Sequence, residues 1–126
     1  MKIASLISRI LLGLVFTIFG LNGFLNFIPM GPMPTGVAGQ YVGALAQSHY
    51  MTIVFVLELI PGILLLANRY VPLALALLAP VIVNIVLFHA TMAPGGLPPA
   101  IVTVVLWLLT AYQVRSNFAG LFQQRT

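Results

Sequence analysis

Glu58 is the residue of this sequence whose side chain could most clearly take part in chemistry, because it is the only acidic residue among 126. It stands in the apolar stretch FVLELIPGILLLAN (55–68), and Pro61 and Gly62 follow one turn later. A carboxylate in hydrocarbon costs roughly 2.5–3.5 kcal/mol even on lenient insertion scales, so such a residue usually faces a protein interior or a cavity and has a partner. Pro61 also removes a backbone donor and so frees the carbonyl of Leu57. The sequence therefore predicts an interior polar site around Glu58.

Two residues on other segments could complete this site. Asn84 follows Pro80 by one turn, and its distance from the end of its apolar segment places it at a depth similar to that of Glu58. Arg9 enters from the opposite end, and an axial gap of roughly 6–10 Å allows a direct or water-bridged pair with Glu58. Two interpretations stay open. The cluster either joins helices, with Glu58 protonated or paired to Arg9, or it binds a polar head group or relays a proton.

Four further polar residues are weaker candidates for ligand contacts. His49 and His89 lie near the predicted outer ends of neighbouring segments. Each could ligate haem iron or a chlorophyll magnesium, donate to a quinone carbonyl, or only cap a helix. Helical periodicity does not place either histidine on the face of the predicted polar cluster. Asn22 and Asn26, spaced i and i+4, could hydrogen-bond a ligand or bridge two helices.

The composition argues against self-contained chemistry. The chain has no cysteine, one carboxylate and two histidines. This removes thiolate metal sites, dithiol redox centres and paired carboxylates, and no Ser/His/Asp set or phosphate-binding loop is present. We therefore predict no catalytic residue and no metal site, and we expect no enzyme activity from the chain on its own. The five basic residues are scattered, so nucleic-acid binding is not expected either.

The elements that must position these residues are membrane helices. The chain is 61% hydrophobic and 5% charged, whereas about a quarter of the residues in a soluble domain are charged. Four apolar segments, at approximately 3–27, 50–67, 71–92 and 98–114, are long enough to cross a bilayer. We therefore predict an all-α, integral membrane four-helix bundle that forms one domain over 1–126.

The charges predict the orientation of this bundle. With four spans, all basic residues fall on the side of the termini: Lys2, Arg9, Arg69, Arg115 and Arg125. By the positive-inside rule both termini of this multi-pass protein are cytoplasmic. Short interfacial helices are expected in the first outer loop and in the C-terminal tail, where Phe118, Leu121 and Phe122 share one side.

A stripe of small residues in the first span predicts close helix packing. At 100° per residue one face of this span combines three glycines with larger residues: Arg9, Gly13, Phe16, Gly20, Gly23 and Phe27. Glycines on one stripe allow a second helix to approach closely. Together with the lack of self-contained chemistry, this packing face favours a protein that assembles with other membrane subunits.

Three segments resemble the DoxX family of small bacterial four-helix membrane proteins: RILLGLVFTIFGLNGFLNF (9–27), LELIPGILLLANRYVPLAL (57–75) and PVIVNIVLFHATMAPGGLPPA (80–100). The resemblance covers nearly the whole chain. It is carried by an Arg entering the first span, the glycines after it, the Glu58-x-x-x-Gly62 spacing and a polar residue in the third span. It implies a four-helix bundle in the inner membrane. Founding members of the family resemble subunits of a thiosulfate:quinone oxidoreductase, which implies a role in membrane redox complexes.

These observations lead to one functional prediction and two alternatives. We predict a non-catalytic accessory subunit of a larger membrane redox or electron-transfer complex, with lipid and other membrane subunits as partners. The first alternative is a quinone-linked oxidoreductase subunit with a pocket around Glu58, Asn84 and Arg9. The second is a small carrier of a lipid or solute that uses the same cluster. Quinone is the candidate cofactor, and haem or chlorophyll at His49 or His89 is the weaker one.

Overall fold

The computed structural model describes residues 2–29 and 31–124. Within these residues four helices are long and apolar enough to cross a membrane. They are α1 (Lys2–Leu25), α3 (Tyr50–Ala67), α4 (Val71–Thr91) and α5 (Leu97–Gln113), the last preceded by the short 3₁₀ helix η1 (Pro94–Gly96). Two shorter elements complete the chain, α2 (Gly36–Gln47) and the 3₁₀ helix η2 (Arg115–Phe122). The predicted all-helical bundle with four candidate spans is confirmed.

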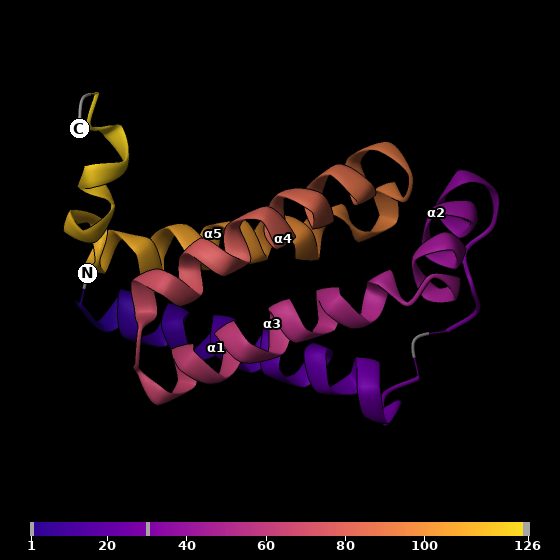
Figure 1. The fold of residues 1–126 in the computed structure, drawn as a ribbon, viewed down its shortest axis with the longest axis horizontal. Helices are drawn as coiled ribbons and strands as arrows, with labels where there is room; N and C mark the ends of the chain where they lie inside the picture. The colour runs from indigo at the N-terminus through magenta and orange to yellow at the C-terminus, as the bar shows by residue number, and fades with distance from the viewer. Residues whose placement is uncertain (1, 30, 125–126) are drawn as a thin grey trace.

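The four long helices pack in a ring in which α1 contacts α3 and α5, and α4 contacts the same two helices. Figure 1 shows both termini at one end of the bundle, with α2 at the opposite end. The buried core lies between the helices and consists mainly of aliphatic side chains with one aromatic ring: Leu12, Phe16, Leu65, Val71, Ala74, Leu75, Leu78, Val81 and Ile82. The outward faces are also apolar, as expected for helices that meet lipid.

The packing of α1 against α3 depends on glycine. A Cβ atom on Gly62 would lie 2.7 Å from the backbone nitrogen of Thr17 and 3.1 Å from the carbonyl oxygen of Gly13. A Cβ atom on Gly20 would lie 3.0 Å from backbone atoms of Leu59. The two backbones are thus too close for side chains at these positions, and the predicted glycine stripe on the first span is confirmed.

Left-handed residues set the ends of two spans. Asn26 has φ 53°, and its N–H donates to the carbonyl of Asn22 at 2.9 Å, so α1 ends two residues before the predicted limit of 27. Asn68 has φ 55° and Tyr70 has φ 50°, and these left-handed residues form a tight turn between α3 and α4. Asparagine tolerates this conformation because its short side chain can bond locally.

The two short elements differ in detail from the expectation. α2 is a helix of 12 residues in the first loop; it contacts α3, and the ring of Tyr41 meets that of Phe88 at 5.5 Å. In η2 the ring of Phe118 lies 6.3 Å from Trp107, whereas Leu121 and Phe122 are exposed. Phe118 therefore packs against the bundle, and the surface position expected for the tail stays a prediction. Arg125, one of the five basic residues, lies outside the described residues.

Candidate functional site

Glu58 faces a cavity of about 580 Å³ between the helices, in the half of the bundle away from the termini. The cavity walls come from α1, α2, α3, α4, η1 and α5. Most of the lining is apolar, and the polar side chains on it are Asn22, Asn26, Glu58, His89 and Thr103. Small-molecule sites in proteins usually occupy roughly 300–1,000 Å³ and combine apolar walls with a few polar groups. This cavity has both properties, and we refer to it as the Glu58 cavity.

Glu58 is positioned by the middle of α3 and is only 8% exposed. The rings of Phe16, Phe19 and Phe55 line the same cavity, so the carboxyl group sits among apolar surfaces. No described residue forms a hydrogen bond or an ion pair with Glu58. A buried carboxyl group without a protein partner is costly, and a ligand with a hydrogen-bond donor would reduce that cost.

His89 is held at the edge of the cavity by the turn between α4 and α5. Its Nδ1 lies 3.1 Å from the carbonyl oxygen of Ala93, and its ring stacks on Phe88 with centroids 5.1 Å apart. A carbonyl can only accept, so Nδ1 carries the proton and Nε2 of the neutral ring presents a lone pair. His89 is therefore suited to accept a hydrogen bond from a ligand, whereas the sequence suggested a donor to a quinone carbonyl.

The sequence did not place His89 with Glu58, yet both line this cavity. The reason is the turn after α4. Gly96 approaches the imidazole so closely that a Cβ atom there would lie 2.3 Å from the ring. The sequence does contain a signal for this contact, namely the Gly95-Gly96 pair, which ends seven residues after His89. Only glycine lets the backbone return this close to a side chain.

Asn22 and Asn26 also line the cavity, but their hydrogen bonds are local. Asn22 is buried; its Oδ1 accepts from the N–H of Ile28 at 2.7 Å, and its Nδ2 donates to the Ile28 carbonyl at 3.2 Å. This clamp holds the chain after α1 against the helix end. Asn26 caps the helix through its left-handed backbone. Neither residue bridges two spans, so that part of the expectation is wrong, while the predicted ligand contact stays a prediction.

Asn84 does not join Glu58. Its side chain is exposed on α4, on the side opposite the buried Ile82, and it does not line the cavity. The two residues are at similar depth, as the sequence suggested, but depth does not determine the direction in which a helix turns a side chain. Because α4 is apolar on all sides, its hydrophobic pattern did not reveal the buried face.

Arg9 does not join Glu58 either. Its guanidinium donates to the carbonyl of Leu65, which lies seven residues further along α3 than Glu58, or about 10 Å along the helix axis. The long arginine side chain turns towards the end of the bundle that holds the termini, where its charge is closer to water. The predicted pocket around Glu58, Asn84 and Arg9 is therefore wrong in two of its three members.

His49 lies apart from the cavity. It precedes α3 in a left-handed conformation, with φ 63°, and its side chain is exposed. In the described part of the chain no group of three His, Cys, Asp or Glu residues could hold a metal ion. The two histidines therefore do not form a common site.

Comparison of the chain with profiles of protein families, with curated proteins and with solved structures finds no match.

Proposed function

We propose that the protein is a small subunit of a membrane redox assembly and that the Glu58 cavity binds a quinol-type molecule, an apolar ring that carries hydroxyl groups. One observation supports this proposal above the others. Glu58 is the only carboxyl side chain in the sequence, it is buried, and it faces a largely apolar cavity without a hydrogen-bonding partner among the described residues. The DoxX resemblance favours the same class of function.

Two polar groups of the cavity, on Glu58 and His89, can accept hydrogen bonds from hydroxyl donors. The Glu58 carboxylate accepts hydrogen bonds, and Nε2 of His89 accepts one as well. Both groups can also take up a proton, so a quinol oxidised in this cavity would leave its protons on these residues and its electrons on an acceptor in a partner subunit. The protein's own part is to bind the ring, orient the hydroxyl groups and receive protons.

The experiment that tests this proposal is a binding measurement with a short-chain quinol. Radiolabelled decylubiquinol is partitioned between nanodiscs with and without the purified protein, and the excess bound by protein is measured. Replacing Glu58 by Gln is expected to weaken binding about 10-fold, because a lost hydrogen bond of about 1.4 kcal/mol corresponds to a factor of ten in affinity. The matched control is Asn84→Leu, which changes a polar side chain outside the cavity and should leave binding unchanged.

Three results would contradict the proposal. The first is the absence of protein-dependent retention of decylubiquinol. The second is equal affinity of the wild type and the Glu58→Gln variant when both remain folded. The third is tighter binding of a long-chain alcohol than of decylubiquinol, which would favour the carrier of a lipid or solute.

The outward position of Asn84 supports the subunit part of the proposal. An apolar groove of about 390 Å³ lies between α4 and α5; Val83, Leu87, Trp107 and Leu108 are among its lining residues, and Asn84 is on the same helix α4. The side chain of Asn84 forms no hydrogen bond with a described residue. An amide that faces lipid also finds no water to form hydrogen bonds with. A transmembrane helix of a partner subunit, with a hydrogen-bonding side chain opposite Asn84, would fill the groove and satisfy the amide.

We expect the protein to migrate in a larger particle when it is extracted gently from native membranes and run on a blue-native gel. Asn84→Leu should release it from that particle, because a lost interhelical hydrogen bond costs about 0.6–2 kcal/mol and lowers the occupancy of the complex. The expectation would be contradicted if the wild type migrated as a monomer in detergent, with the 13.6 kDa mass of the single chain.

We infer that the protein lies in the cytoplasmic membrane with both termini on the cytoplasmic side. The basic side chains in the described part of the chain support this orientation, since Lys2, Arg9, Arg69 and Arg115 all belong to the end with the termini or to the α3–α4 turn there. A reporter enzyme that is active only in the cytoplasm, fused to the C-terminus, checks the orientation.

A further inference from the structure

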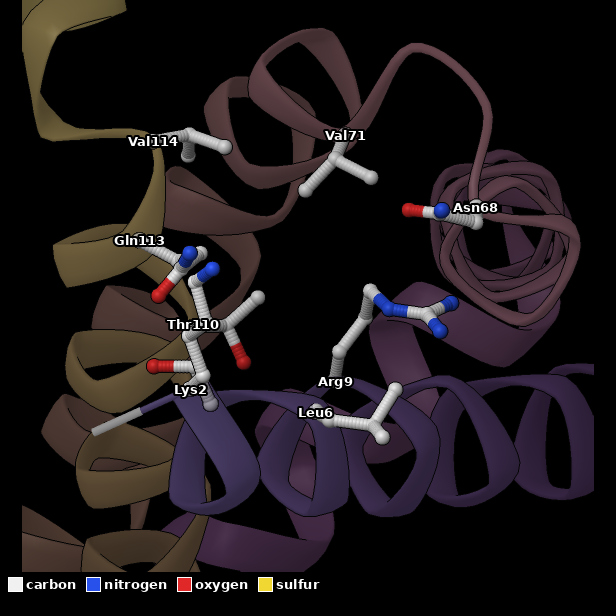
Figure 2. Close-up of a pocket in the computed structure, with 9 residues that line it drawn as sticks. Lys2, Leu6, Arg9, Asn68, Val71, Thr110, Gln113 and Val114 are labelled. Atoms are coloured by element: carbon white, nitrogen blue, oxygen red, sulfur yellow. The ribbon is translucent and has the colours of Figure 1, made fainter.

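A second, smaller pocket of about 260 Å³ lies at the end of the bundle that holds the termini. It is formed by the first turns of α1, the α3–α4 turn and the last turn of α5. Figure 2 shows Lys2 beside Thr110 and Gln113 on one side of the pocket, while Arg9 points towards Asn68 on the other. The pocket is separate from the Glu58 cavity, and its ligand chemistry is independent of the function proposed for that cavity.

The pocket collects positive charge without a counter-charge. Lys2 and Arg9 both line it, and none of the described residues forms an ion pair with either of them. The chain has five basic residues but only one acidic residue, Glu58, and that residue lines the other cavity. The described residues therefore supply no anion that neutralises Lys2 and Arg9.

The hydrogen-bonding groups of the pocket show which kind of anion fits. The hydroxyl groups of Ser5 and Thr110 are already used, because each donates to a backbone carbonyl at 2.8 Å. Arg9 uses one of its donors on the carbonyl of Leu65 and keeps the others. The remaining groups are the Lys2 ammonium, these guanidinium N–H groups and the amides of Asn68 and Gln113. Each of these groups can donate hydrogen bonds, and phosphate oxygens are acceptors that arginine and lysine bind well.

The apolar residues of the pocket extend this argument from phosphate to lipid. Leu6, Val71 and Val114 line the same pocket as the cations. The helices that surround it are long and apolar enough to cross a membrane, and this is the end of the spans, where lipid head groups lie. Basic pockets between transmembrane helices at such a level bind anionic head groups.

We propose that this pocket binds the phosphate of an anionic phospholipid head group, with Lys2 and Arg9 on its oxygens and the amides of Asn68 and Gln113 as further donors. The same donor set would accept a free phosphate, so the test has to separate these two sources. The site ties three segments together, namely α1, the α3–α4 turn and the end of α5. Occupation is therefore expected to stabilise the bundle as well as to neutralise its charge.

The experiment uses the full chain in mild detergent and counts bound lipids by native mass spectrometry. The probes are dioleoyl phosphatidylglycerol and, as the neutral reference, dioleoyl phosphatidylcholine. We expect one phosphatidylglycerol to bind at least 10-fold more tightly than phosphatidylcholine. Arg9→Gln and Lys2→Gln should each remove most of that preference, and added salt should weaken it.

The matched control is Arg69→Gln, which removes the same charge from the same end of the bundle but from a residue that does not line the pocket. It should change the affinity less than twofold. Lys2 is exposed, so the Lys2→Gln variant tests the site even if Arg9→Gln disturbs folding. Equal losses in all three variants would assign the effect to general surface charge and overturn the proposal, as would the absence of a preference for phosphatidylglycerol in the wild type.

Inorganic phosphate separates the two sources of the anion. Inorganic phosphate is added at about 10 mM, the usual strength of a buffer. If the site binds the lipid head group, phosphatidylglycerol should stay bound under this condition. Displacement by phosphate but not by chloride of the same ionic strength would show that a free phosphate is the ligand, and would overturn the lipid assignment.

Discussion

Replacing Gly62 by Ala is expected to lower the free energy of unfolding by about 1–3 kcal/mol, the usual cost of forcing extra atoms into a packed interior. The new Cβ atom would lie 2.7 Å from the backbone nitrogen of Thr17. A backbone atom in a helix cannot rotate away as a side chain can, so α1 and α3 have to move apart. Since α1 and α3 form the most extensive helix contact of the bundle, the loss should extend along both helices.

The matched control for this substitution is Gly43→Ala in α2. Apart from the adjacent residues and the backbone of α2 itself, no described atom lies within 4 Å of the position of a Cβ atom at Gly43, so the same chemical change meets no packed neighbour there. Alanine also favours a helix over glycine, which should leave the control equal to the wild type or slightly more stable. Thermal unfolding in mild detergent gives the comparison. Equal midpoints for both variants would show that α1 and α3 are not packed as closely as the structure has them.

Replacing Gly96 by Ala is expected to weaken decylubiquinol binding about 10-fold with little loss of stability. The Cβ atom would lie 2.3 Å from the imidazole ring of His89. A side chain can give way where a backbone cannot, so the ring moves and the fold remains. In the function proposed above, Nε2 accepts a hydrogen bond from the ligand, and movement of the ring would take it away from that position. A lost hydrogen bond of about 1.4 kcal/mol corresponds to a factor of ten in affinity.

The neighbouring residue provides the control for Gly96. At Gly95 no described atom outside the adjacent chain lies within 4 Å of the position of a Cβ atom, so Gly95→Ala changes the same turn without touching His89. It should bind decylubiquinol as the wild type does. Equal weakening in both variants would indicate that the turn itself, and not the position of His89, controls binding. A ring nitrogen resonance of His89 that shifts in Gly96→Ala alone would confirm that the ring has moved.

The two cavities differ in how far they could be predicted. Glu58 was recognised as an interior polar residue because a single carboxyl group in an apolar chain has to be sheltered. The pocket of Lys2 and Arg9 was not predicted, although both residues were used to predict orientation. Its members come from α1, the α3–α4 turn and the end of α5, which are far apart in the sequence, and only the ring arrangement of the helices brings them together.

The number of candidate spans, their bounds to within two residues and the glycine face of the first span could all be predicted from the sequence. These features depend on local composition, because an apolar stretch of sufficient length must close its backbone hydrogen bonds as a helix in lipid. The left-handed asparagine at the end of α3 also follows from local preference.

Which polar residues lie together could not be predicted, because it depends on how the helices pack against one another. In the folded bundle Asn84 is exposed, Arg9 donates to the carbonyl of Leu65, and His89 lines the Glu58 cavity. The physical reason is that lipid is as apolar as the protein core, so a membrane helix shows no clear contrast between its buried and its exposed face. The rotation of each helix then depends on packing contacts such as Gly62 against Thr17, which involve residues distant in the sequence.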